Sequence, residues 1–217
     1  MTSTTWRRAG ALTGILAIVL AFVGDAIATS SGTTDVHSSD AALLAALSGN
    51  HGAAWHLGIG LALIGFAGIM VFAAYLASLM REESWLANAT LGSGVLFVAI
   101  KLVSVVPVWE AYWRAPGIDA GTARTLMDLG DFAFQVGLLP FALLVGFAGA
   151  GALRAGLLPR GLAIAGIVIA VLGVALMPAG VDGPGGAAWL LGLLWLAATS
   201  VVLAQRERAP RGRPLAV

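Results

Sequence analysis

Residues 53–80 read AAWHLGIGLALIGFAGIMVFAAYLASLM, an apolar stretch without Asp, Glu, Lys or Arg. A helix needs about 20 apolar residues to cross a hydrocarbon core about 30 Å thick. The stretch therefore predicts a transmembrane helix. Its glycines, among them Gly58 and Gly65, predict close packing against another helix, because no strand precedes them as a phosphate loop would require.

Five further apolar runs repeat this pattern along the chain. The predicted spans lie at about 9–28, 85–106, 129–153, 161–177 and 187–204. We expect the first run to be a retained helix, because it is longer than the hydrophobic core of a usual signal peptide, about 7–15 residues. The predicted fold is all-α: an integral membrane bundle of six transmembrane helices that forms one domain over residues 1–204.

Prolines divide the predicted helices. Pro107 is expected to end the third helix, because proline lacks an N–H donor and disfavours helix in the residue before it. Residues 108–128 mix aromatic and charged side chains, which is typical of the headgroup region of a membrane, so we expect a loop there. Pro140 falls inside the fourth predicted helix and is expected to bend it.

Composition excludes several classes of function. Of 217 residues, 59% are hydrophobic and 11% charged, against about 45–50% and 25% in soluble domains. The mean hydropathy is +0.92, and the six spans leave no room for a sizeable soluble domain. The chain has no cysteine, which excludes disulfides, thiolate catalysis and cysteine-bound iron–sulfur clusters. A net charge of +1 gives no argument for nucleic acid, and no cofactor is expected.

The arginines predict the orientation. Nine fall on one side of the predicted bundle and two, Arg114 and Arg124, on the other. Cytoplasmic loops carry the excess of basic residues, so both termini are expected in the cytoplasm and the protein in the inner (plasma) membrane. Residues 205–217 form a basic, proline-bearing tail that we expect to be disordered.

The first outer loop, residues 29–52, is polar and encloses a short apolar segment at 41–47. Asp40 precedes this segment as a plausible N-cap. The segment is too short to span a membrane, so we expect a short helix that lies across the outer membrane surface.

Ionisable side chains inside apolar spans cost about 2.5–3.5 kcal/mol each on insertion scales, so each requires a partner or a use. The candidates all fall in the outer half of the predicted bundle, which predicts an outward-facing polar pocket. The expected ligand-binding residues are Lys101, Asp25, Asp128, Asp131, Gln135 and His56.

Lys101 has two interpretations. The simpler one is a structural ion pair with Asp25 or Asp131 that fixes how the helices pack. The functional one is a proton relay or an anion-binding site, in which Lys101 supplies the positive charge and Asp25 or Asp131 is its titrating partner.

No metal site is predicted. His51 and His56 are five residues apart, which turns them about 140° away from each other on a helix. A pair of histidines four residues apart would have been the stronger signal for zinc.

One stretch resembles a known group of proteins. It runs from Asp128-Leu-Gly-Asp131 through Gly137-Leu-Leu-Pro140 to LRAGLLPR at 153–160 and GLAIAG at 161–166. The pattern is similar to that of uncharacterised bacterial six-helix integral membrane proteins. The resemblance implies the same topology and assigns no functional residue.

Three functional hypotheses remain open from the sequence. The first is small-molecule or proton-coupled binding and transport through the predicted pocket, with an apolar or anionic ligand. The second is a membrane-embedded enzyme that acts on an isoprenoid or lipid, such as a cyclase, with Asp25, Glu110 and Asp131 as candidate acids. The third is a non-catalytic subunit or regulator with a protein partner.

Overall fold

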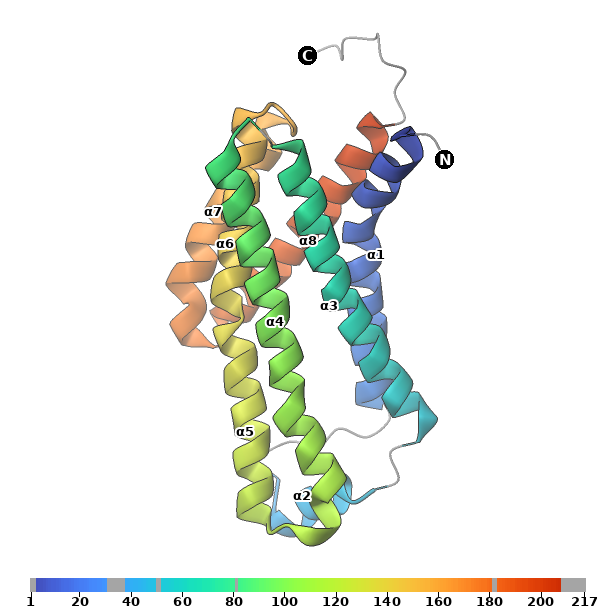
Figure 1. The fold of residues 1–217 in the computed structure, drawn as a ribbon. Helices are drawn as coiled ribbons and strands as arrows, with labels where there is room; N and C mark the ends of the chain where they lie inside the picture. The colour runs from blue at the N-terminus through green and yellow to red at the C-terminus, as the bar shows by residue number, and fades with distance from the viewer. Residues whose placement is uncertain (1–2, 31–37, 50–51, 81, 181–182, 208–217) are drawn as a thin grey trace.

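The computed structural model describes residues 3–30, 38–49, 52–80, 82–180 and 183–207, and within them the chain is helical with no strand. Figure 1 shows the helices running side by side. Their bounds are α1 Ser3–Ser30, α2 Asp40–Leu47, α3 Ala53–Leu79, α4 Ser84–Arg114, α5 Ala120–Val136, α6 Leu138–Arg154, α7 Arg160–Leu176 and α8 Pro184–Arg206, with 3₁₀ turns η1 at Ala115–Gly117 and η2 at Met177–Ala179.

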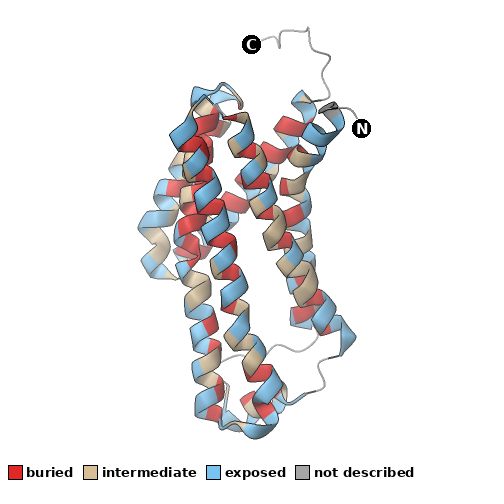
Figure 2. Ribbon diagram, in the orientation of Figure 1, coloured by how far each residue is buried: buried red, intermediate tan, exposed pale blue. Residues whose placement is uncertain are grey.

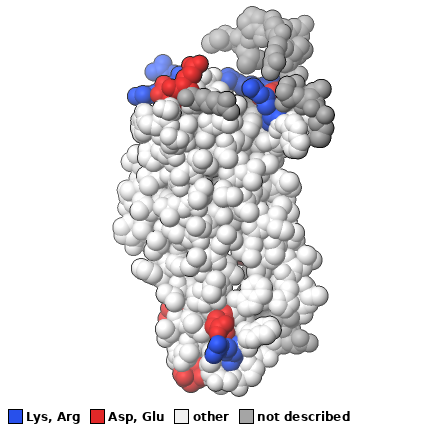
Figure 3. All heavy atoms as spheres, viewed as in Figure 1, with Lys and Arg blue, Asp and Glu red and all other residues white. Residues whose placement is uncertain are grey.

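Six helical segments are long and apolar enough to cross a membrane, α5 and α6 together forming one of them. This confirms the predicted number of spans. Large apolar side chains lie exposed along their outer faces, such as Phe132, Leu194 and Val171. On the face drawn in Figure 3, charged side chains gather at the two ends and leave an uncharged band between them. Such a surface suits lipid as its surroundings.

Helices α1 and α3 approach each other at glycines, as the sequence predicts. A Cβ added at Gly58 would lie 2.6 Å from Ala28 N, and one added at Gly65 would lie 2.7 Å from Ala17 O. Both neighbours are backbone atoms, so only glycine allows this approach. The close pairing rigidly sets the face that α1 presents to the rest of the bundle.

The prediction that Pro107 ends a helix is wrong. Helix α4 continues through Pro107 to Arg114. Inside lipid, backbone groups have no water to bind, so a helix that meets a proline tends to continue beyond it. Packing also favours continuation, because Ala111 and Tyr112, beyond the proline, are buried against other helices.

The predicted loop at 108–128 is also largely helix, because α5 begins at Ala120 and not at 129. Asp119 caps it: its Oδ1 accepts a hydrogen bond from Thr122 N at 2.9 Å. Helix α5 then ends at Val136 and α6 starts at Leu138, so Gly137 forms the junction between them, and Pro140 follows it by three residues. Proline removes one backbone donor and its ring clashes with the carbonyl four residues earlier, here that of Val136.

The short helix predicted in the first loop is α2, although its N-cap is Ser39 rather than Asp40. The Ser39 hydroxyl oxygen accepts from Ala42 N at 3.4 Å, and Asp40 is the first helical residue. Leu43 and Leu47 are fully buried in an apolar cluster with Trp55 and other residues from the ends of α1, α3, α4 and α5. Helix α2 thus packs onto one end of the bundle, opposite the first turn of α1 and the last turn of α8 (Figure 1).

The apolar interior consists of two clusters. The larger includes Ile69, Phe97 and Leu193, and the smaller is the one beside α2. In Figure 2 the buried positions lie mainly on helix faces turned toward neighbouring helices. Because one cavity is lined by members of both clusters, it lies between them.

Candidate ligand-binding cavity

A cavity of about 360 Å³ lies between α1, α3, α4, α5 and α8. Ligand sites in proteins typically enclose about 300–1,000 Å³, so this volume suits a small organic molecule. Its lining consists of Ile18, Ala21, Phe22, Asp25, Ala28, Trp55, Ile59, Ala62, Leu63, Phe66, Ile69, Lys101, Ser104, Val105, Val108, Tyr112, Met127, Gly130, Asp131, Phe134, Trp189 and Leu193.

Helix geometry explains why these residues meet. On α1 the lining residues recur every three or four positions, from Ile18 through Asp25. The same spacing places Met127, Asp131 and Phe134 of α5 on one face. Side chains three and four residues apart project from the same side of a helix, so each helix contributes one continuous stripe.

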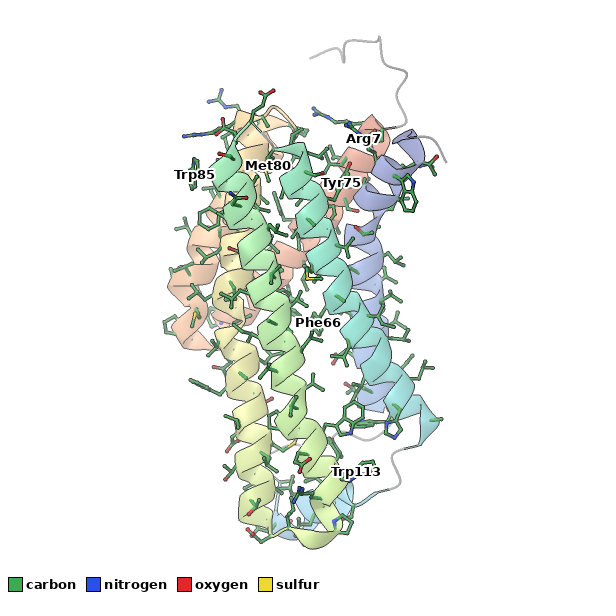
Figure 4. The ribbon with its side chains drawn as sticks, in the orientation of Figure 1. Arg7, Phe66, Tyr75, Met80, Trp85 and Trp113 are labelled. Carbon is green, nitrogen blue, oxygen red and sulfur yellow. The ribbon has the colours of Figure 1, made fainter. Side chains whose placement is uncertain are left out.

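The walls are mainly apolar and rich in aromatic rings. Phe66 reaches from α3 toward α4 (Figure 4), where its ring lies 6.1 Å from that of Phe97 between centroids. At the α2 end, the ring of Trp55 lies 4.8 Å from that of Tyr112. Trp189 of α8 also lines the cavity, and its ring centroid lies 5.8 Å from that of Phe134.

Lys101 is fully buried, with an exposed fraction of 0%. Its Nζ donates a hydrogen bond to the backbone oxygen of Phe134 at 3.1 Å. Aromatic rings surround the ammonium: the ring of Phe134 lies against it, and the centroids of Phe97 and Trp189 are 5.7 and 5.9 Å away. Cation–π attraction and the hydrogen bond together hold the charge inside the bundle.

The α5–α6 junction provides the carbonyl that Lys101 binds. In an unbroken helix, Phe134 O would accept from the residue four positions later, but here Gly137 N–H reaches it at 3.1 Å. The Phe134 carbonyl lies in the last turn of α5, where the helix dipole favours a positive charge. Gly137 also leaves space for the lysine, because a Cβ there would lie 3.3 Å from Lys101 Cε.

Asp25 and Asp131 line the same cavity from different helices, α1 and α5, and both are exposed. The structure therefore brings together three of the predicted ligand-binding residues: Lys101, Asp25 and Asp131. The ion pair between the lysine and either aspartate stays a prediction.

The other candidates lie elsewhere. Asp128, exposed, and Gln135, half-buried, are on α5 but do not line the cavity. The His56 ring stands edge-on to that of Trp55, 5.1 Å away, and 6.0 Å from that of Trp109. Glu110 forms an i,i+4 ion pair with Arg114 and lines a neighbouring groove.

That groove lies between α3 and α4, and it shares Leu63 and Val105 with the cavity. Its other residues include Leu102 and Val106, which are exposed where lipid would contact the bundle. The groove and the cavity therefore adjoin each other at Leu63 and Val105.

The sequence reasoning missed the aromatic lining, notably Phe134 and Trp189. The sequence did hold a signal for Phe134, because this residue follows Asp131 by three positions and so lies on the same helix face. The sequence holds no such signal for Trp189, because its approach to the cavity depends on how α8 packs. Its Nε1 is buried and has no hydrogen-bond partner among the described residues.

Among the residues that the structure describes, no three His, Asp or Glu side chains form a group that could hold a metal ion. Comparisons with models of protein families, with curated proteins and with solved structures returned no match.

Proposed function

We propose that this membrane protein binds an apolar small molecule in the cavity between α1, α3, α4, α5 and α8. One observation carries the proposal: a cavity of about 360 Å³ with aromatic walls, into which two carboxylates from different helices project. Apolar walls with a few polar groups are the usual composition of a ligand site. Binding of this kind is the first step of the transport hypothesis.

The groove between α3 and α4 is the proposed entry path. A ligand dissolved in the bilayer would pass Leu63 and Val105, which line both the groove and the cavity. This path needs no opening of the end of the bundle that α2 covers.

We also propose that the termini face the cytoplasm, which directs the α2 end of the cavity outward. At the end that holds the first turn of α1, Arg7 lies 3.9 Å from Glu207, Arg154 lies 3.3 Å from Glu83, and Arg206 donates to Gly156 O. The described arginines at the other end are Arg114 and Arg124, so the basic excess supports this orientation.

Filling the cavity tests the proposal. Val105→Trp places a large ring where the groove meets the cavity, whereas Val103→Trp makes the same change at a side chain that is 63% exposed on the outside of α4. The probe is neutral N-phenyl-1-naphthylamine, added to protein purified in a non-ionic detergent, and the readout is the thermal unfolding midpoint.

We expect the probe to raise the midpoint of the wild type and of Val103→Trp, and to leave that of Val105→Trp unchanged. A ligand that binds only the folded state stabilises it by RT ln(1 + L/Kd), where L is the free ligand concentration, so a variant that no longer binds the probe loses the shift. An equal shift in all three proteins would mean that the probe binds outside the cavity, and no shift in any would contradict the proposal.

The same cavity favours one second candidate, an enzyme acting on an isoprenoid. Asp25 and Asp131 stand among aromatic faces that can stabilise a carbocation, whereas Glu110 lies outside the cavity. Incubation of the purified protein with isoprenoid substrates, followed by mass spectrometry of the products, tests this candidate. Unchanged substrate would exclude it for the compounds used.

A further inference from the structure

The charges in the cavity wall differ in their accessibility. The ammonium of Lys101 has no exposed surface, because the ring of Phe134 and its own hydrogen bond enclose it. The indole Nε1 of Trp189 is likewise buried. Asp25 and Asp131 are exposed. A molecule inside the cavity therefore contacts the carboxylates, while the Lys101 ammonium and the Trp189 indole N–H are shielded from it.

Aromatic faces strengthen this preference for positive charge. Trp55, Phe66 and Phe134 line the cavity together with the carboxylates. The face of an aromatic ring is negative, and it attracts ammonium and quaternary ammonium groups within about 6 Å by about 0.5–2 kcal/mol. The walls thus attract a cation and also accommodate an apolar body.

The formal charge of the lining points in the same direction. Two carboxylates against one ammonium give the lining a formal charge of −1. A monovalent cation in the cavity complements this formal charge.

A small inorganic cation does not fit this lining. With only two carboxylates, Mg²⁺ or Ca²⁺ would complete its shell of six or more oxygens with several waters. Here the Ser104 hydroxyl donates its hydrogen bond to Lys101 O, and the remaining walls are mainly apolar, so they offer those waters few partners. An organic cation requires no such oxygen cage.

We propose that the ligand of the cavity is a hydrophobic organic cation, such as a quaternary ammonium or phosphonium compound. Its charge lies between Asp25 and Asp131, and its apolar groups pack against the aromatic walls. The inference rests on the proposed function and names the class of ligand for the same site.

A pair of ions with the same shape and opposite charge tests the inference. Tetraphenylphosphonium and tetraphenylborate have nearly identical size, so a difference in their affinity reports charge. Equilibrium dialysis of each radiolabelled ion against wild type in a non-ionic detergent gives the two dissociation constants. Asp25→Asn and Asp131→Asn remove one charge each, and Glu82→Gln, an exposed acid at the opposite end of the bundle, is the matched control.

We expect the wild type to bind the phosphonium at least about tenfold more tightly than the borate, which corresponds to about 1.4 kcal/mol. Each aspartate variant should weaken phosphonium binding by about three- to tenfold, and Glu82→Gln should not change it. The wild-type comparison needs no variant, so it remains decisive if a substitution impairs folding.

Tighter binding of the borate would overturn the inference and make Lys101 the governing charge. Equal affinity for both ions would also overturn it. In either case the proposed function stands if neutral N-phenyl-1-naphthylamine still stabilises the wild type but not Val105→Trp. If neither the ions nor the neutral probe binds, the proposed function fails as well.

Discussion

At the scale of single residues, Lys101 shows how a buried charge can serve structure. Its ammonium binds the Phe134 carbonyl in the last turn of α5 and lies among three aromatic rings. A positive charge at this position complements the helix dipole at the α5–α6 junction. The lysine therefore links α4 to the junction between α5 and α6.

We expect Lys101→Met to lower stability, because the methionine cannot donate to Phe134 O. Polar interactions between transmembrane helices contribute about 0.6 kcal/mol on average and at most about 1.7 kcal/mol, and we expect a loss in this range. Unfolding in mixed micelles measures it. Because the bond to the carbonyl dominates, adding Asp25→Asn or Asp131→Asn should not restore stability. Recovery in either double variant would instead establish the ion pair that the sequence suggests.

At the scale of helices, the start of α5 depends on a polar cap rather than on apolar periodicity. Asp119 accepts from Thr122 N at 2.9 Å and from the Thr122 hydroxyl at 2.7 Å. These bonds favour the ionised carboxylate and hold the pKa of Asp119 below its ordinary value of 3.8. The cap fixes where α5 begins.

Asp119→Ala should lower the thermal midpoint at pH 7. A carboxyl whose pKa is lower in the folded state stabilises that state above its unfolded pKa, and this contribution disappears as pH falls through the folded pKa. The difference between wild type and variant should therefore be constant from pH 7 to about 5 and shrink below about pH 4. A difference that does not change with pH would show that the carboxylate charge is unimportant for the cap.

At the scale of the whole molecule, α2 and the arginines distinguish the two ends of the bundle. Helix α2 is attached by buried Leu43 and Leu47 and by Arg124, whose Nη2 lies 2.8 Å from Asp40 Oδ1. The opposite end has the basic excess. These differences give the cavity a direction relative to the membrane once the orientation is measured.

A reporter fused after Val217 should be cytoplasmic, because the basic excess lies at that end of the bundle. Paired fusions of alkaline phosphatase and of green fluorescent protein measure the orientation, since the first is active only outside the cytoplasm and the second fluoresces only inside it. Active phosphatase at this position would reverse the orientation and direct the α2 end of the cavity inward.

The sequence by itself determined the class of the protein. Runs such as residues 53–80 can satisfy their backbone groups in lipid only as helices, so apolar length alone predicts the six spans. The glycines of α3 likewise predicted its close packing, because a missing Cβ acts locally.

Only the tertiary structure decided the helix bounds and the site. Pro107 stays inside α4 because residues beyond it are packed, which local propensity does not report. Asp131 enters the cavity while Asp128 does not, because neighbouring helices determine which side of α5 faces inward. The burial of Lys101 depends on Phe134 and Trp189, which are far from it in sequence and reach it through helix packing.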